Sequence, residues 1–481
     1  MKRVVYIRVD GNARIGLGHL IRCVSLALML KKKFTVKFIC KEIPDDLKDN
    51  IFKQGIESII IKEEEEFFEL LSYGQIIVID GYSFDYEYQR RIKEIEVKLV
   101  CIDDVHKSRF NCDILLNYTP GVEIKEYNAA PYTIFALGMN YILLRPSFLK
   151  QAKKPKEVNK METVFICFGG SDPLNLTQKT LEITLCQLIF KKIIIVTGHA
   201  NQNKAYIESI SKNDSRIIHK HAVNEQEMLK LMIKSDVAIV PASSMLYEVL
   251  SVGCIPVTGK YVDNQDLVYE YFKKSGCIVD AGTFSSDEIK LALKKIATDQ
   301  NKIKLIDGIS PIRILKLFTI LDKEFRIKLQ KASISDLNIT FEWANNEIIR
   351  QFAFNKHIIS IEEHTNWFIS KINNPQCFYY LAFQNSIPLG SIRFDVIEGE
   401  AIISYLVDPK YHGQGYGKTI LKMGIEILMK ELSNICVKVF VGKVFLQNIQ
   451  SIRAFESLGF EKKDNKDYYK YVKWVTTDLL K

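Results

Sequence analysis

The chain has 481 residues, too many for one hydrophobic core, and this length favours about three domains. Hydrophobic residues make up 47% and charged residues 26%, which fits a soluble globular protein, and no apolar stretch is long enough to cross a bilayer. Arg8 and Asp10 interrupt the apolar start too early for a signal peptide, so we expect a first strand and a cytoplasmic protein.

The formal net charge is +9, and the lysines are spread along the chain rather than interleaved with aromatic residues. This pattern disfavours nucleic acid as a partner and suits small anionic substrates such as nucleotide diphosphates. The ten cysteines include no Cys-x-x-Cys pair, so reduced, buried thiols are expected rather than disulfides or a zinc site.

Short apolar runs that alternate with helical patterns fill the first two thirds of the chain. The first series has its expected strands at residues 3–9, 36–40, 59–61, 76–79, 99–102 and 114–117, with a helix at about 18–32. A lysine-containing segment, Pro146–Lys160, is expected to be a linker. The second series has its expected strands at residues 164–168, 193–197, 217–219, 237–240 and 255–257. We therefore expect two Rossmann-like α/β lobes, residues 1–150 and 151–325, with a ligand cleft between them.

The pattern changes after Phe325. Apolar runs now form an antiparallel meander, and a long helix, a strand, a second helix and a final strand pair follow, at residues 378–383, 389–396, 401–407, 416–431, 436–441, 448–458, near 460 and 468–472. Residues 326–481 are therefore expected to form a third, α+β domain.

Three loops between a strand and a helix are candidate sites in the two lobes. Glycines beside a helix N-terminus let an anion approach backbone N–H groups. In the first loop, Ile15-Gly16-Leu17-Gly18-His19, the histidine is either an acid or base or only lines the cleft. The second loop contains Gly169, Gly170, Ser171 and Asp172. It is expected to be a diphosphate cradle, or a helix start capped by Asp172 with Pro173 at the first helical position, and both interpretations can hold together. The third offers two hydroxyls and a carboxylate, from Ser243, Ser244 and Glu248.

Several of these motifs, in this order, resemble the UDP-2,4-diacetamido-2,4,6-trideoxy-β-L-altropyranose hydrolases of pseudaminic acid biosynthesis. The resemblance covers about residues 1–320 and rests on Arg8-x-Asp10, the loop ending at His19, Arg22-Cys23, Leu26-Ala27, Asp80-Gly81-Tyr82, Leu144-Arg145-Pro146, Gly169-Gly170-Ser171-Asp172-Pro173 and Asn264-Gln265. It implies a two-lobed glycosyltransferase (GT-B) fold and a reaction that needs no metal.

The resemblance also implies roles for individual residues. His19 would be the main catalytic residue, acting on the water that displaces UDP, and Tyr82 and Asn264 would line the sugar site beside Gln265. The loop that contains Gly169, together with Ser243 and Ser244, would hold the diphosphate, and Glu248 would hold the ribose. Gly16, Gly18 and Arg22 are expected among the other substrate-binding residues.

A glycine-rich run joins a meander strand to the long helix of the third domain. It would expose consecutive N–H groups to a pyrophosphate, through Val407, His412, Gly413, Gln414, Gly415, Tyr416, Gly417 and Lys418. With Asn448 and the run Phe455-Glu456-Ser457-Leu458-Gly459-Phe460, it resembles the acetyl-CoA site of GNAT acetyltransferases over about residues 326–475. This implies acetyl-CoA as co-substrate. Phe455 stands where the family commonly has a tyrosine that protonates the departing thiolate, so a nearby tyrosine or water would have to replace it.

The acceptor side of this domain gives fewer indications. Glu400, or alternatively Glu398, is a candidate base, although each could be a solvated surface residue. Arg350, His364 and Trp367 are expected near the acceptor, because the segment resembles acetyltransferases of the 4-amino group of UDP-linked amino sugars. The chain would then join two consecutive steps. A glycosyltransferase, an acetyl-CoA-sensing domain, and a protein or polyamine acetyltransferase remain alternatives.

Overall fold

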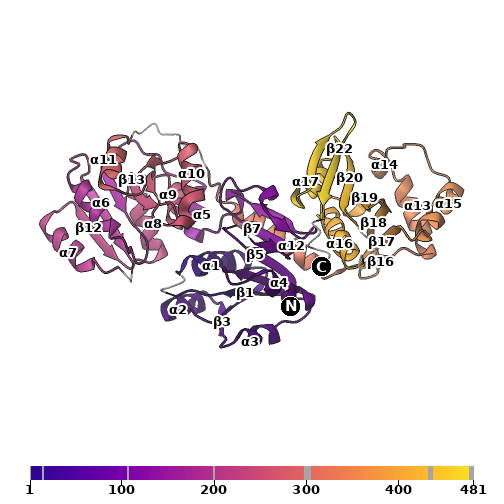
Figure 1. Cartoon of the computed structure of the whole chain (residues 1–481), viewed down its shortest axis with the longest axis horizontal. Coiled ribbons are helices and arrows are strands. Elements are labelled where there is room, and N and C mark those ends of the chain that lie inside the picture. The colour runs from indigo at the N-terminus through magenta and orange to yellow at the C-terminus, as the bar shows by residue number, and fades with distance from the viewer. Residues whose placement is uncertain are drawn as a thin grey trace.

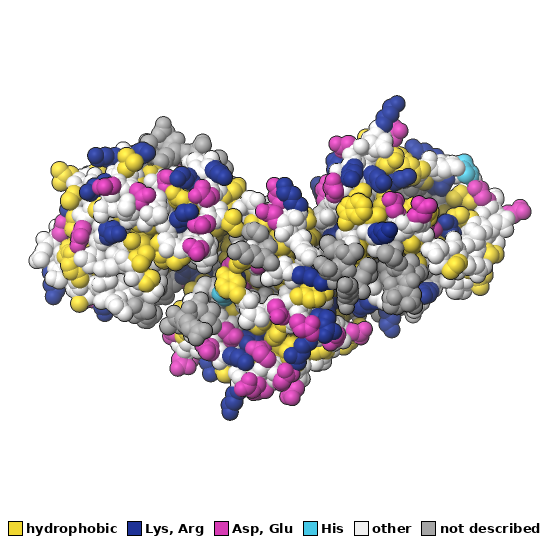
Figure 2. Space-filling model, viewed as in Figure 1, with side chains coloured by type: hydrophobic (Ala, Val, Ile, Leu, Met, Phe, Trp, Pro, Cys, Tyr) yellow, Lys and Arg dark blue, Asp and Glu magenta, His cyan; other side chains and the backbone are white. Residues whose placement is uncertain are grey.

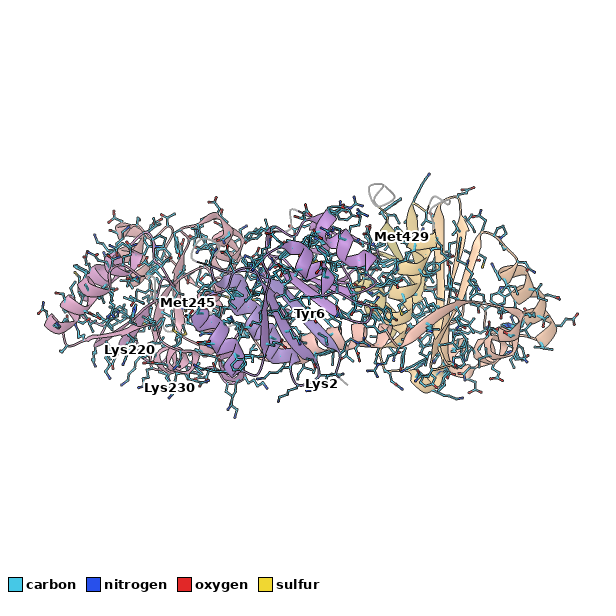
Figure 3. All side chains as sticks on the ribbon, turned by 90° about the horizontal axis from the view of Figure 1, so that it is seen from below. Lys2, Tyr6, Lys220, Lys230, Met245 and Met429 are labelled. Carbon is cyan, nitrogen blue, oxygen red and sulfur yellow. The ribbon has the colours of Figure 1, made fainter. Side chains whose placement is uncertain are left out.

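The computed structural model describes residues 2–12, 16–105, 108–198, 201–296, 305–431 and 437–475. Three sheets lie in a row, with the first lobe between the second lobe and the C-terminal domain (Figure 1). The view from below gives the same order, with Met245 on the second lobe and Met429 on the C-terminal domain (Figure 3). Each sheet falls inside one of the three expected residue ranges.

The first lobe is a seven-stranded parallel sheet in the order β3-β2-β1-β4-β5-β7-β9. Its central strands are apolar and buried on both faces, as helix-covered parallel strands require. The strands are β1 Val4–Val9, β2 Thr35–Cys40, β3 Glu57–Ile60, β4 Ile76–Asp80, β5 Lys98–Ile102, β7 Ile114–Asn117 and β9 Ile134–Leu137, with the short pair β6 Arg109–Phe110 and β8 Asn128–Ala129. The helices are α1 Gly18–Leu30, α2 Asp45–Lys53, α3 Glu64–Glu69 and α4 Tyr86–Glu94.

The second lobe repeats this design with six parallel strands in the order β12-β11-β10-β13-β14-β15. The strands are β10 Thr163–Ile166, β11 Lys192–Thr197, β12 Ile217–His221, β13 Val237–Pro241, β14 Ile255–Gly259 and β15 Val279–Asp280. The helices of this part of the chain are α5 Pro146–Ala152, α6 Leu176–Leu185, α7 Lys204–Asn213, α8 Glu225–Ile233, α9 Ser244–Val252, α10 Asp266–Lys274, α11 Ser286–Lys294 and α12 Ser310–Glu324.

Two helices connect the lobes. The expected linker was wrong in its first half, because Pro146–Ala152 forms α5, whose Phe148 and Leu149 are buried against the core and which packs on α9. The last helix, α12, returns to the first lobe and packs on α1, where Arg3 Nε lies 2.6 Å from Asp322 Oδ1.

The C-terminal domain has a seven-stranded mixed sheet in the order β16-β17-β18-β19-β20-β22-β21. Only β19 and β20 pair in parallel, from Glu400 opposite Val439 to Ile403 opposite Gly442, and the rest of β19 diverges toward the glycine-rich loop. The elements are β16 Ile327–Lys331, β17 Cys377–Gln384, β18 Ile387–Ile397, β19 Glu400–Val407, β20 Val439–Phe445, β21 Glu461–Asp464, β22 Tyr468–Trp474, α13 Leu337–Asn345, α14 Glu347–Arg350, α15 Ile361–Ile372, α16 Tyr416–Glu431 and α17 Ile449–Ser457. The predicted fold class is confirmed.

Features expected from composition can be checked over the described residues. The nine cysteines in this part of the chain are all free, and Cys436 lies outside it. No helix among these residues is long and apolar enough to cross a membrane. On the face shown in Figure 2, basic and acidic side chains are interspersed over all three parts.

A buried ion cluster joins the C-terminal domain to the first lobe. Its members are three lysines and three carboxylates, Lys93, Lys98, Lys422, Asp113, Glu324 and Glu426. Lys422 Nζ, from α16, lies 2.6 Å from Asp113 Oδ1 of the first lobe and 2.7 Å from Glu324 Oε2 of α12, and all three side chains are 0% exposed. Removing one partner would leave an uncompensated buried charge, so the cluster fixes this interface.

We expect Lys422→Met to lower the Tm by about 10 °C, since breaking a buried ion pair costs about 3–5 kcal/mol and each kcal/mol lowers the Tm of a large domain by about 2–4 °C. Lys316→Met on α12 is the control, because this lysine is exposed and does not belong to the cluster. Differential scanning calorimetry measures both variants, and equal melting temperatures would contradict a structural role for the cluster.

Candidate active sites

The N-terminus of α1 is open to an anion. Gly16, with φ +89°, turns the chain toward the helix, and Ile15 of the expected loop lies outside the described residues. The helix begins at Gly18 with no side-chain cap and no acidic residue in its first turn. Its first N–H groups and its positive dipole end are therefore available to a phosphate.

His19 is held by a carboxylate that the sequence analysis quoted without giving it a role. Its Nδ1 lies 2.7 Å from Oδ1 of Asp80, which ends the buried strand β4. Burial opposes ionisation of Asp80, but Arg22 outweighs this effect and lowers the pKa of Asp80 to about 2. An ionised carboxylate only accepts hydrogen bonds, so the 2.7 Å contact with Asp80 favours a proton on Nδ1 and leaves Nε2 to accept one. Nη2 of Arg22, which can only donate, also lies 2.9 Å from Nδ1 and competes with Asp80 for this nitrogen.

Arg22 organises this pair. Its Nε and Nη2 donate to the two oxygens of Asp80 at 2.6 and 2.5 Å, and its Nη1 donates to Asp104 at 2.8 Å. Each nitrogen thus serves a carboxylate, and the side chain is only 10% exposed. Arg22 borders the cleft between the lobes, but its guanidinium is already hydrogen-bonded to Asp80 and Asp104. Its expected contact with substrate stays a prediction.

Residues of both lobes line a cavity of about 640 Å³ beside His19. Tyr82 places its ring edge-on to His19, with 5.0 Å between ring centroids, and it lines the cavity together with Asn264 of the second lobe. Burial, helped by the charge of Asp104, raises the pKa of Tyr82 to about 12. The structure thus brings together the two residues expected at the sugar site. Gln265 is buried instead, and its Oε1 accepts the N–H of Tyr261.

The loop after β10 has a backbone that no side chain covers at its two glycines. A Cβ at Gly169 or Gly170 would meet no atom within 4 Å, and the neighbouring Ser171 is exposed. Asp172 does not face this space: its carboxylate accepts the N–H groups of Leu176 and Thr177 at 2.9 and 2.8 Å. The expected cap was wrong in its position, because α6 begins at Leu176 with Asn175 as its N-cap, although the Asp172 carboxylate does bind the first N–H groups of this helix. The contact of Asp172 with the diphosphate stays a prediction.

A second helix N-terminus faces the first across the cleft. Ser244 begins α9 and borders the same small hollow as Gly18, while Ser243 caps the helix through Met245 N–H at 3.4 Å. Glu248 lies one turn further on, where Arg145 Nε and Nη2 hold its two oxygens at 2.8 and 2.7 Å. Its contact with ribose stays a prediction.

The glycine-rich loop of the C-terminal domain also ends at an open helix start. Gly413 and Gly415 have φ +74° and +85°, with nothing within 4 Å of a Cβ at either position, and Gln414 between them is exposed. His412 fixes the start of the loop, because its Nε2 is hydrogen-bonded to the carbonyl oxygen of Val407 at 2.8 Å.

Three other predicted loop residues face the protein rather than the open side of the loop. Tyr416 is buried and donates to Gln384 Oε1 at 2.8 Å. Gly417 approaches the side chain of Tyr405 on β19. Burial lowers the pKa of Lys418 to about 8.

The environment of Phe455 identifies a hydroxyl that the sequence analysis did not name. Phe455 is 2% exposed and stacks on Tyr471, while Asn448 caps α17 through the N–H of Ser451 at 3.1 Å. Beside Phe455, on the diverging part of β19, Tyr405 donates its hydroxyl to Ser451 Oγ at 3.0 Å.

Of the expected acceptor residues, His364 and Trp367 lie side by side on α15, with 5.4 Å between their ring centroids. Glu400 is exposed at the first residue of β19, and the glycine-rich loop follows the last residue of this strand, Val407. At about 3.3 Å per residue the two ends of the strand are about 23 Å apart. Glu398 lies in the hairpin turn before Glu400, so neither carboxylate lies near the loop, where the expected base would act. His364 is 2% exposed and bonds Thr340 within the core. Arg350 binds the carbonyls of Asn355 and His357. Trp367 lies under the guanidinium of Arg393, at 4.9 Å.

The geometry defines a two-lobed α/β protein with a cavity of about 640 Å³ between the lobes, joined to a domain with an open glycine-rich loop. Residues 326–461 match the Acetyltransferase (GNAT) domain family. The UDP-2,4-diacetamido-2,4,6-trideoxy-beta-L-altropyranose hydrolase of Campylobacter jejuni is 32% identical over 57% of this chain and 98% of its own length. The chain therefore belongs to the family of this hydrolase and carries a GNAT domain in addition.

Two further relatives extend this picture. An uncharacterized protein of Methanocaldococcus jannaschii is 27% identical over 95% of this chain and 96% of its own length, so its match spans both parts. The spore coat polysaccharide biosynthesis protein SpsG of Bacillus subtilis is 24% identical over 58% of this chain and 83% of its own length.

The tautomer of His19 is directly testable. With Asp80 ionised, we expect ¹⁵N NMR of histidine-labelled protein to show neutral His19 protonated on Nδ1, and Asp80→Asn to increase the Nε2-protonated form, because an amide can also donate. A His19→Gln spectrum assigns the signal, and exposed Asp46→Asn is the control. Protonation on Nε2 in the unaltered protein would contradict the assignment.

Proposed function

We propose that the two lobes hydrolyse UDP-2,4-diacetamido-2,4,6-trideoxy-β-L-altropyranose, and that the GNAT domain acetylates the 4-amino group of its UDP-linked precursor with acetyl-CoA. The chain would then perform two consecutive steps of pseudaminic acid biosynthesis in the cytoplasm. The observation that carries the hydrolase assignment is the His19–Asp80 pair beside the cavity between the lobes. The family to which the chain belongs supports the substrate.

In the proposed hydrolysis, His19 Nε2 accepts a proton from the water that attacks the anomeric carbon, and the bond from that carbon to the UDP oxygen breaks. The N-termini of α1 and α9 and the bare backbone at Gly169 would stabilise the departing diphosphate. Tyr82 and Asn264 would orient the sugar. The cavity also has an apolar wall suited to the methyl groups of a deoxy, acetylated sugar, formed by Ile79, Phe84, Ile102 and Phe110. No step of this reaction requires a metal.

In the proposed acetyl transfer, the N–H groups around Gly413 and Gly415 would hold the pyrophosphate of acetyl-CoA, and the acyl arm would enter where β19 and β20 diverge. The amine attacks the thioester carbon, and the carbon–sulfur bond breaks. Tyr405, in place of the hydroxyl that Phe455 lacks, would give its proton to the thiolate and recover one from the newly formed amide nitrogen through water.

A combined phosphorus and proton NMR time course tests both reactions. The UDP-4-amino sugar and acetyl-CoA are supplied together, and we expect a new acetamido signal first and free UDP later. Release of UDP only when a second sugar acceptor is added would indicate glycosyl transfer instead. Acetylation of polyamines or peptides without any sugar nucleotide would contradict the proposed acceptor.

His19→Ala should retain binding of the UDP-sugar and lose at least about 100-fold in UDP release, the range expected for removal of a general base. Isothermal titration and the phosphorus NMR assay measure the two quantities. The exposed His357→Ala in the GNAT domain is the control. Turnover of His19→Ala near that of the unaltered enzyme would remove His19 from the mechanism.

Tyr405→Phe should lower the kcat of acetylation by about 10–100-fold with little change in KM for acetyl-CoA, because only the proton donor is lost. Thiol release is followed with a disulfide reagent, and UDP release serves as an internal control for folding. Tyr206→Phe, on the second lobe, is the matched substitution. An unchanged kcat would exclude Tyr405 as the donor.

A further inference from the structure

The last helix of the hydrolase part reaches the glycine-rich loop of the GNAT domain. Lys323, in the final turn of α12, donates its ammonium to the backbone carbonyl of Gln414, and its Nζ lies 4.7 Å from the ring centroid of Tyr416. In Figure 1, α12 lies between the first lobe and α16. A lysine from outside the GNAT domain thus stands at the loop that is open to phosphate.

No carboxylate in the part of the chain that the structure describes neutralises the charge of Lys323. Its neighbours in α12 are both paired, Asp322 with Arg3 at 2.6 Å and Glu324 with Lys422 at 2.7 Å. No carboxylate among the described residues lies within 4.0 Å of Lys323 Nζ, and burial lowers the pKa of this lysine. An ammonium has three N–H donors, and the Gln414 carbonyl takes one, so two remain for an anion.

We propose that Lys323 binds a phosphate group of acyl-CoA, so that the co-substrate site of the GNAT domain is completed by the hydrolase part. This contact rests on the proposed acetyltransferase function. Lys323 binds the loop backbone between Gly413 and Gly415, the two positions where the loop is open, so an acyl-CoA bound along the loop would bring one of its phosphate groups within reach of the ammonium. A partly desolvated ammonium forms a charge-assisted hydrogen bond with a phosphate, stronger than one between neutral groups.

The proposal gives the fusion a physical consequence. A GNAT domain cut off at residue 326 would lose Lys323 at its loop and Glu324 beside Lys422. The acetyltransferase would then need the hydrolase part for binding its co-substrate, even if it could fold without it.

The test compares two acyl donors in the full-length enzyme. Lys323→Met should raise the KM for acetyl-CoA about tenfold and leave the KM for S-acetylpantetheine, which has no phosphate, unchanged. Lys323→Arg should restore most of the affinity for acetyl-CoA. The exposed Lys316→Met on the same helix should change neither KM. Titration with CoA should show the same tenfold loss of affinity for Lys323→Met.

Other results would overturn the contact. An equal loss with both donors would mean that Lys323 only holds the Gln414 carbonyl, and an unchanged KM for acetyl-CoA would mean that it touches no phosphate. If the unaltered protein binds no CoA in the titration, the proposed acetyltransferase function fails, and the contact fails with it. UDP release and the Tm of each variant establish that the protein is folded.

Discussion

The buried ion cluster around Lys422 determines how the parts of this molecule are arranged. Its charges come from α4, β5 and the segment before β7 in the first lobe, from α12, and from α16 of the GNAT domain. The carboxylates of Asp113, Glu324 and Glu426 approach one another closely enough to hold a metal ion, but three ammonium groups lie among them. Each charge therefore depends on partners from another part of the chain. Such a set tolerates neither removal of one member nor separation of the parts, so the GNAT domain is fixed to the first lobe.

The hydrolase site follows a simpler rule, in which parallel strands deliver polar groups to one edge of a sheet. Asp80 ends β4, and α1 starts its first turn with His19 above the same edge. Arg22, one turn later on the same face of α1, keeps Asp80 ionised, and the contacts of both side chains with Nδ1 hold His19 in its orientation. A buried carboxylate without Arg22 would favour its neutral form, and the histidine would lose its defined acceptor.

Local patterns predicted local structure well. The expected helix begins at Tyr416 and the expected strand ends at Val407, as predicted, because apolar periodicity and the glycines between them determine both limits. The second strand–helix loop was harder, since Asp172 bonds N–H groups four and five residues away instead of starting the helix. Pairing between distant segments was not predictable: no local signal shows that Arg22 meets Asp104 or that Glu248 meets Arg145. The one local sign that Asp80 belongs to the site was its place as a single acidic residue directly after the apolar run Ile76–Ile79.

The positions of the two sites limit what the fusion can achieve. The hydrolase cleft lies between the two lobes, whereas the GNAT domain packs on the other side of the first lobe (Figure 1). Under the proposed function, a sugar acetylated in the GNAT domain would therefore leave it before entering the cavity between the lobes, which is lined by residues of those lobes. What joins the parts is α12, which packs along α1 at one end and touches the glycine-rich loop at the other. The helix that carries His19 and the loop proposed to hold acyl-CoA thus both contact α12. This common contact with α12 gives the fusion a structural consequence that requires no direct transfer of an intermediate.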